Sequence, residues 1–106
     1  MKIIFIGCVE IGLRCLRQVI KDGWNIQAIF TLAKKYAGTT SGFIDFSSIA
    51  KSAAITLYKI EDINQDREIS RIKKINPDLI IVCGWQRLLC REILRIPSKG
   101  TIGFHS

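Results

Sequence analysis

The stretch DLIIVCGW, residues 78–85, decides the fold of this chain. It is apolar after its opening aspartate, which is typical of a strand buried on both faces of a parallel sheet, and Gly84 ends the apolar run. Residues 2–6 form a second run of this kind and end at Gly7. Strands that are buried on both faces predict a sheet with a layer of helices on each side.

Helical segments alternate with strands along the rest of the chain. Apolar residues recur at helical spacing after the first strand, again after Asp45 and again after Asn64, and both of these polar residues are plausible helix caps. The pair Asn76-Pro77 ends the third helix, because proline disfavours helical geometry in the residue before it. These patterns predict an α/β fold, a Rossmann-like parallel sheet with helices on both faces, truncated after about five strands. The predicted strands are residues 2–6, 25–32, 56–60, 78–83 and 101–105.

The connections at one edge of this sheet are where a ligand is expected. In such sheets, ligands bind outside the carboxyl ends of the strands, near the point where the strand order reverses. The loops that start at Gly7, Ala33, Gly84 and His105 should therefore share one rim. Residues 33–42 form a long loop with no usable period, so they are either a surface connection or a flap that faces a substrate.

Length and composition exclude several classes of protein. A chain of 106 residues with 48% hydrophobic content is expected to form one domain with one core, not a multi-domain enzyme. The net charge of +7 favours polyanions, but its dispersed lysines and arginines also fit a moderately basic, solvated surface. No apolar tract is long enough to span a membrane and no secretory signal is present, so we expect a cytoplasmic protein.

The cysteines and the histidine indicate no metal site. The four cysteines match neither a zinc nor a redox CxxC pattern, and we expect them to be reduced and mostly buried. His105 is the only histidine, and it has no cluster of other ligands around it in the sequence. A histidine can carry a proton near neutral pH, but a single one at a strand end is also compatible with a structural role. The cysteines are Cys8, Cys15, Cys83 and Cys90.

The turn GCVEIG, residues 7–12, has two interpretations. It is either a helix amino terminus that receives an anion or a tight turn that lets the helix pack closely on the sheet. A dinucleotide fingerprint requires G-x-G-x-x-G and a P-loop ends in GK[ST], and the turn has neither pattern. Glu10 lies inside the turn and would repel a pyrophosphate, which favours the tight turn.

Residues 78–106, DLIIVCGWQRLLCREILRIPSKGTIGFHS, resemble the formyltransferases that use 10-formyltetrahydrofolate. That family has a Pro-Asp-apolar strand, an aromatic-x-x-Ile/Leu-Leu loop, a connection with proline and glycine, and then Asn-x-His-x-Ser-Leu-Leu-Pro. It includes methionyl-tRNA, glycinamide ribonucleotide and nucleotide-sugar formyltransferases. The resemblance extends in outline over the whole chain, and it implies that residues 1–106 are the N-terminal portion of a formyltransferase catalytic domain.

The resemblance also implies a reaction and a set of site residues. The formyl donor would be 10-formyltetrahydrofolate and the acceptor a primary amine. His105 falls on the catalytic histidine that stabilises the tetrahedral adduct, and Trp85, Leu88 and Leu89 fall on the loop that helps to enclose the folate's pteridine ring. These residue types suit the chemistry, because a planar heterocycle binds in an apolar slot and a developing oxyanion needs a nearby positive or donor group.

The sequence departs from the family pattern in two places. Gly103 occupies the position of the catalytic asparagine, and loss of such an oxyanion donor typically costs about a hundredfold in rate. The chain also ends before the Ser-Leu-Leu-Pro loop and before the aspartate that pairs with the histidine, so we expect this fragment itself to be inactive. Within the resemblance, the Gly-Trp and Gly-x-His residue pairs favour a small-molecule amine, such as an amino-sugar nucleotide, over methionyl-tRNA. The family's tRNA recognition relies on a further domain that residues 1–106 do not include, so nucleic acid is expected to be an unlikely partner for this fragment.

Two alternatives come from other classes of protein. One is a non-catalytic Rossmann-type nucleotide-binding or interaction module, in which residues 7–12 receive a phosphate and His105 is incidental. The other is a homodimer that pairs the exposed sheet edge of the last strand with a second copy, because an unpaired edge is a template for another chain. Stabilisation by a folate or by a nucleotide would discriminate the enzyme from the first alternative.

Overall fold

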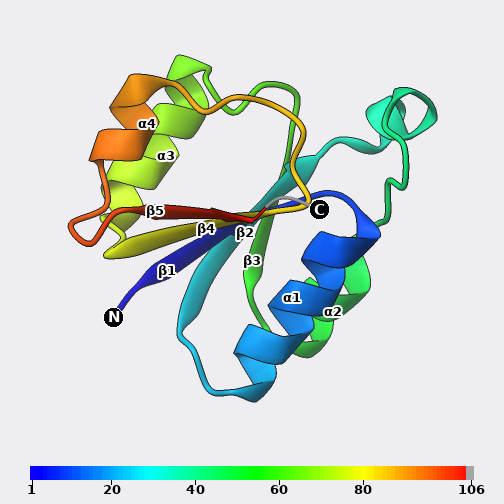
Figure 1. Ribbon diagram of the computed structural model, residues 1–106, viewed down its shortest axis with the longest axis horizontal. Coiled ribbons are helices and arrows are strands. Elements are labelled where there is room, and N and C mark those ends of the chain that lie inside the picture. The colour runs from blue at the N-terminus through cyan, green and yellow to red at the C-terminus, as the bar shows by residue number, and fades with distance from the viewer. Residues whose placement is uncertain (105–106) are drawn as a thin grey trace.

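A five-stranded parallel sheet forms the centre of the computed structural model, which describes residues 1–104 (Figure 1). The strand order is β3-β2-β1-β4-β5, so β1 lies in the middle, with β2 on one side and β4 on the other. The four pairings between neighbouring strands are all parallel, which confirms the predicted parallel sheet. The strands are β1 (Ile3–Ile6), β2 (Ile26–Leu32), β3 (Thr56–Ile60), β4 (Leu79–Cys83) and β5 (Thr101–Phe104).

Helices cover both faces of the sheet, as the sequence predicts (Figure 1). The helices α1 (Glu10–Lys21) and α2 (Ser47–Ser52) lie on one face, and α3 (Asp66–Ile75) and α4 (Arg91–Arg95) lie on the other. Successive residues of each central strand point to opposite faces, so β1 divides its side chains between two apolar clusters. Burial on both faces explains why β1 and β4 are apolar throughout.

The strand order reverses between β1 and β4. The chain runs from β1 outward to β2 and β3, and then crosses to β4 on the other side of β1. Two backbone hydrogen bonds join the turn after β1 to its neighbours: Gly7 donates to the carbonyl of Phe30 in β2 at 3.1 Å, and Cys8 donates to the carbonyl of Gly84, directly after β4, at 3.0 Å. A crevice is expected here, because the loops after β1 and β4 leave the sheet on opposite faces.

The helix boundaries differ from both predicted caps, because the residue that precedes α2 is Phe46 and not Asp45, and no side chain among the described residues caps that helix. The carboxylate of Asp45 accepts a hydrogen bond from the backbone N–H of Ser47 at 2.8 Å, at the start of α2. Asn64 does not cap α3, because Gln65 precedes the helix and the Asn64 amide is engaged with the loop after β4. Asn76 ends α3 in the left-handed conformation, with φ of 54°.

The strand β5 lies at the edge of the sheet and ends, within the part of the chain that the structure describes, at Phe104. Ile102 and Phe104 pair with Ile81 and Cys83 of β4, so they share the face that α1 covers farther along the sheet. They remain 45% and 52% exposed. The predicted strand residue His105 lies outside the described residues.

Candidate functional site

Three glycines bring α1 and the loop after β4 into contact at the crevice. A Cβ atom on Gly7 or Gly12 would lie 2.5 or 2.4 Å from the carbonyl oxygen of Cys83. Gly84 has φ of +68°, and a Cβ atom there would lie 2.7 Å from Cγ2 of Val9 and 2.9 Å from the nitrogen of Gly12. Residues 7–12 therefore form the tight turn that the sequence favours, with the helix packed directly on the strand end.

Residues 84–90 cross this crevice as a loop with one buried anchor. Trp85 is 8% exposed and packs in the core cluster on the α3 and α4 face. Leu88 is 88% exposed, whereas Leu89 is half-buried against the same cluster as Trp85. The loop thus fixes itself to the core through Trp85 and Leu89 and presents Leu88 to solvent.

A cavity of about 340 Å³ lies between this loop and the turn after β1. Of the predicted folate-binding residues, Trp85 and Leu88 line it and Leu89 does not. Phe104, the last described residue of β5, lines the same cavity, and His105 follows it directly in the sequence. The remaining lining residues are Val9, Ile11, Gly84, Gln86 and Arg87.

A second cavity, of about 290 Å³, lies on the other side of the same loop. Gln86 and Arg87 line both cavities, so residues 84–90 act as a partition between them. The segment after β2, which contains the 3-10 helix η1 (Lys34–Thr39), supplies another wall. This confirms that the loops after Gly7, Ala33 and Gly84 share one rim. The second cavity is lined by Cys8, Leu32, Thr39, Thr40, Gln86 and Arg87.

Arg87 links the loop after β4 to the segment that contains η1 by an electrostatic contact. Its guanidinium carbon lies 5.4 Å from the centroid of the Tyr36 ring in η1, within the range of a cation–π contact. Burial raises the pKa of the nearby Cys8 thiol, and the positive charge of Arg87 partly offsets this effect. The Cys8 thiol is therefore protonated at neutral pH and contributes a small, weakly polar wall to the second cavity.

A larger open groove, of about 500 Å³, lies between α1 and α2. Arg17 and Lys21 of α1 and Ser48 and Ser52 of α2 are among its lining residues. The groove contains no residue from the carboxyl ends of the strands. We therefore place the candidate site at the rim and not at this larger groove.

The described residues 1–104 offer no group of three histidine, cysteine, aspartate or glutamate side chains that could hold a metal ion. The four cysteines are free thiols in the structure; Cys8 and Cys83 are buried, whereas Cys15 and Cys90 are half-buried, so the expectation of mostly buried cysteines holds for two of them. No helix among residues 1–104 is long and apolar enough to cross a membrane.

Comparison of the sequence with known proteins identifies relatives of this chain. No family model matches the chain. Proteins named methionyl-tRNA formyltransferase from Clostridioides difficile and Methylacidiphilum infernorum are 32% and 33% identical to it over 99% of its length. The chain is homologous to the formyltransferases. A third such protein, from Clostridium tetani, is 33% identical over the whole chain. The chain spans about a third of the length of these relatives, between 34% and 35%.

The homology to formyltransferases supports the family resemblance seen in residues 78–106. It lends no support to a small-molecule acceptor, because these relatives are named for methionyl-tRNA. Sequence reasoning missed two residues of the rim, Tyr36 and Arg87. Tyr36 lies in a segment without periodicity, and Arg87 stands between residues that were selected for their apolar character.

Proposed function

We propose that the rim binds 10-formyltetrahydrofolate and that the protein transfers its formyl group to a primary amine. The observation that carries this proposal is the cavity between the turn after β1 and the loop after β4, which holds Trp85, Leu88 and Phe104 at the point where the strand order reverses. The homology to formyltransferases supports the same reaction class.

The residues of the first cavity fit a pteridine ring. Leu88 offers a free apolar side chain, and the loop backbone beside it offers hydrogen-bonding groups, which is the combination that a planar heterocycle needs. The Nε1 atom of Trp85 is buried and has no hydrogen-bond partner among residues 1–104.

Each side chain would have a limited task. The bound donor supplies the formyl group that the amine accepts. Trp85 and Leu88 would hold the folate and exclude water from one side of it. His105, next to Phe104 in the sequence, would stabilise the negative charge that develops on the formyl oxygen and assist proton transfer. Leu89 would support the loop from the core side.

The second cavity is our candidate for the acceptor amine. It shares Gln86 and Arg87 with the first cavity, so a donor and an acceptor on the two sides would meet at the same loop. The positive charge of Arg87 suits an anionic acceptor, and both a nucleotide-linked amino sugar and an aminoacyl-tRNA are anionic. The relatives' name places methionyl-tRNA first among the acceptors to test.

Folate binding can be tested with the protein's own fluorescence. The chain has two tryptophans, and Trp24, which precedes β2 at the opposite end of the sheet, can be replaced by phenylalanine so that Trp85 becomes the single reporter. We expect 5-formyltetrahydrofolate, a stable isomer of the donor, to quench Trp85 in a saturable way. Leu88→Ala should weaken binding, whereas Leu94→Ala, at a 44% exposed position on α4, should not.

Two results would overturn the proposal. One is quenching by NAD with no response to the folate, which would favour a nucleotide-binding module. The other is a Leu88→Ala variant that binds the folate as tightly as the parent.

Formyl transfer is then assayed with methionyl-tRNA and with a nucleotide-linked amino sugar, using both the 106-residue chain and the full product of its gene. We expect transfer by the full product and none by the 106-residue chain.

A further inference from the structure

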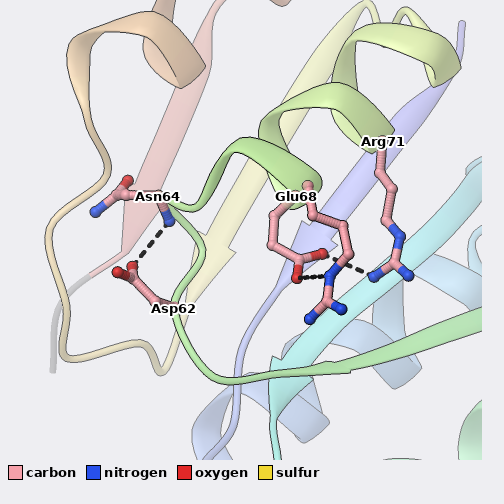
Figure 2. Close-up of polar contacts among 5 residues, drawn as sticks. Asp62, Asn64, Glu68 and Arg71 are labelled. Atoms are coloured by element: carbon pink, nitrogen blue, oxygen red, sulfur yellow. Dashed lines mark hydrogen bonds and ion pairs between the residues drawn. The ribbon is translucent and has the colours of Figure 1, made fainter.

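Asn64 lies in the short connection between β3 and α3, and the two residues before it fix its backbone. The side chain of the preceding residue, Ile63, is 1% exposed and packs in the core. The carboxylate of Asp62 accepts a hydrogen bond from the backbone N–H of Asn64 at 2.9 Å (Figure 2). The side chain of Asn64 points away from the ion pair that Glu68 forms with Arg71 on α3 (Figure 2).

The side-chain amide of Asn64 grips the loop after β4 at two points. Its Nδ2 atom donates to the carbonyl oxygen of Leu88 at 3.0 Å. Its Oδ1 atom accepts from the backbone N–H of Cys90 at 2.8 Å. One side chain therefore satisfies one acceptor and one donor of a segment that lies more than twenty residues away in the sequence.

These bonds matter because the Leu88 side chain has little packing of its own. At 88% exposure, it is not held in place by neighbouring side chains. The loop is also anchored near its start, where the carbonyl of Gly84 accepts from Cys8 and Trp85 is buried, and at Arg87, which lies over the Tyr36 ring. Leu89 adds apolar packing against the core, but this contact does not fix the polar groups of the backbone. Asn64 is the polar contact, among those that the structure describes, that fixes the backbone on both sides of Leu89.

We propose that Asn64 is a positioning residue, whose amide holds residues 88–90 so that Leu88 and the loop backbone are in place for the pteridine ring. This inference rests on the function proposed above. Asn64 does not itself line either cavity, so it would act through the loop and not by contact with the ligand.

Two substitutions distinguish the donor Nδ2 of the Asn64 amide from its acceptor Oδ1. Asn64→Asp keeps an acceptor for the Cys90 N–H, but it loses the donor and places a carboxylate against the carbonyl of Leu88. Asn64→Ala removes both contacts. Asn25→Ala is the matched control. Among residues 1–104, the Asn25 side-chain amide has one hydrogen-bond partner, Gln27, from which it accepts at 2.9 Å. Asn25 directly precedes β2, at the end of the sheet opposite the rim.

The first measurement needs no ligand. Amide hydrogen exchange of Cys90, followed by NMR, should become at least about tenfold faster in Asn64→Ala and remain slow in Asn64→Asp, because only the second variant keeps the acceptor. Asn25→Ala should leave this exchange rate unchanged. Unchanged exchange in Asn64→Ala would overturn the inference.

The second measurement is the Kd of 5-formyltetrahydrofolate, determined from Trp85 fluorescence with Trp24→Phe in every variant. We expect about a tenfold increase in Kd for Asn64→Ala and a smaller increase for Asn64→Asp. If the parent binds the folate and Asn64→Ala binds it equally well, the inference is wrong although the proposed function stands. If the parent itself fails to bind, the proposed function is refuted and the inference falls with it.

Discussion

Replacing Gly12 by alanine tests the close contact that shapes the crevice. The new Cβ atom would lie 2.4 Å from the carbonyl oxygen and 3.3 Å from the carbonyl carbon of Cys83. Both are backbone atoms of a central strand, so neither can swing aside as a flexible side chain would. The first turn of α1 must therefore move away from β4.

The size of the effect follows from the overlap. Ordinary contacts begin at 3.4 Å, so the helix must retreat by about 1 Å. Overpacking of this kind costs roughly 1–3 kcal/mol, and the higher helix propensity of alanine returns at most about 1 kcal/mol. We expect a net loss of about 1–2 kcal/mol in the free energy of unfolding, which lowers the Tm of a domain of this size by about 5–10 °C.

The assay is reversible unfolding in urea and by heat, with Gly38→Ala as the control. Gly38 lies in η1, its φ is not in the left-handed region, and a Cβ atom there would meet nothing within 4 Å. Gly38→Ala should be neutral or slightly stabilising. A Gly12→Ala variant with the same unfolding midpoint as the parent would refute the packing argument and, with it, our account of how the crevice is formed.

Three further predictions concern charge and the thiols. Arg71→Ala should lower the free energy of unfolding by about 2 kcal/mol, because it removes the 2.8 Å bond to the fully buried Glu68 carboxylate. Arg14→Ala, which removes an exposed ion pair with Glu10, should change it by less than about 0.5 kcal/mol. Urea titration measures both values. Burial and the neighbouring Cys15 raise the pKa of Cys83 to about 11, so Cys83 should be the last thiol alkylated by iodoacetamide at pH 8, as mapped by mass spectrometry. The backbone N–H of Lys2 donates to the Asp78 carboxylate and lowers the pKa of Asp78 below its ordinary value of 3.8. The stability that the ionised Asp78 contributes is therefore complete above pH 3.8 and is lost as the pH falls through the folded-state pKa. Acid unfolding of Asp78→Asn should show a shallower pH dependence than that of the parent, and an unchanged slope would contradict this.

The partition between the two cavities gives the loop after β4 a central place in the proposed reaction. Gln86 and Arg87 face both sides, Trp85 anchors the loop and Leu88 is presented by it. A shift of this loop would change both binding sites at once. The substitutions at Asn64 are informative for this reason, because they loosen the loop without touching either cavity.

The sequence by itself predicted a parallel sheet with helices on both faces and the rim at which we propose the site. Two short apolar runs that end in glycine predict strands buried on both faces, and the alternating helical segments then favour parallel connections, which place the loops after the strands on one rim. The residues of the loop after β4 were selected by a family resemblance that the homology to formyltransferases now supports. These features are local or periodic, so a single sequence records them.

Only the tertiary structure decided how individual side chains are used there. The sequence pattern predicts Asn64 as a helix cap, yet its amide binds a loop that is near in space and distant along the chain. Leu88 and Leu89 are the same residue type in adjacent positions, and only the path of the loop sends one to solvent and the other to the core. Contacts between segments distant in the sequence depend on how the layers pack, and neither residue type nor periodicity encodes them.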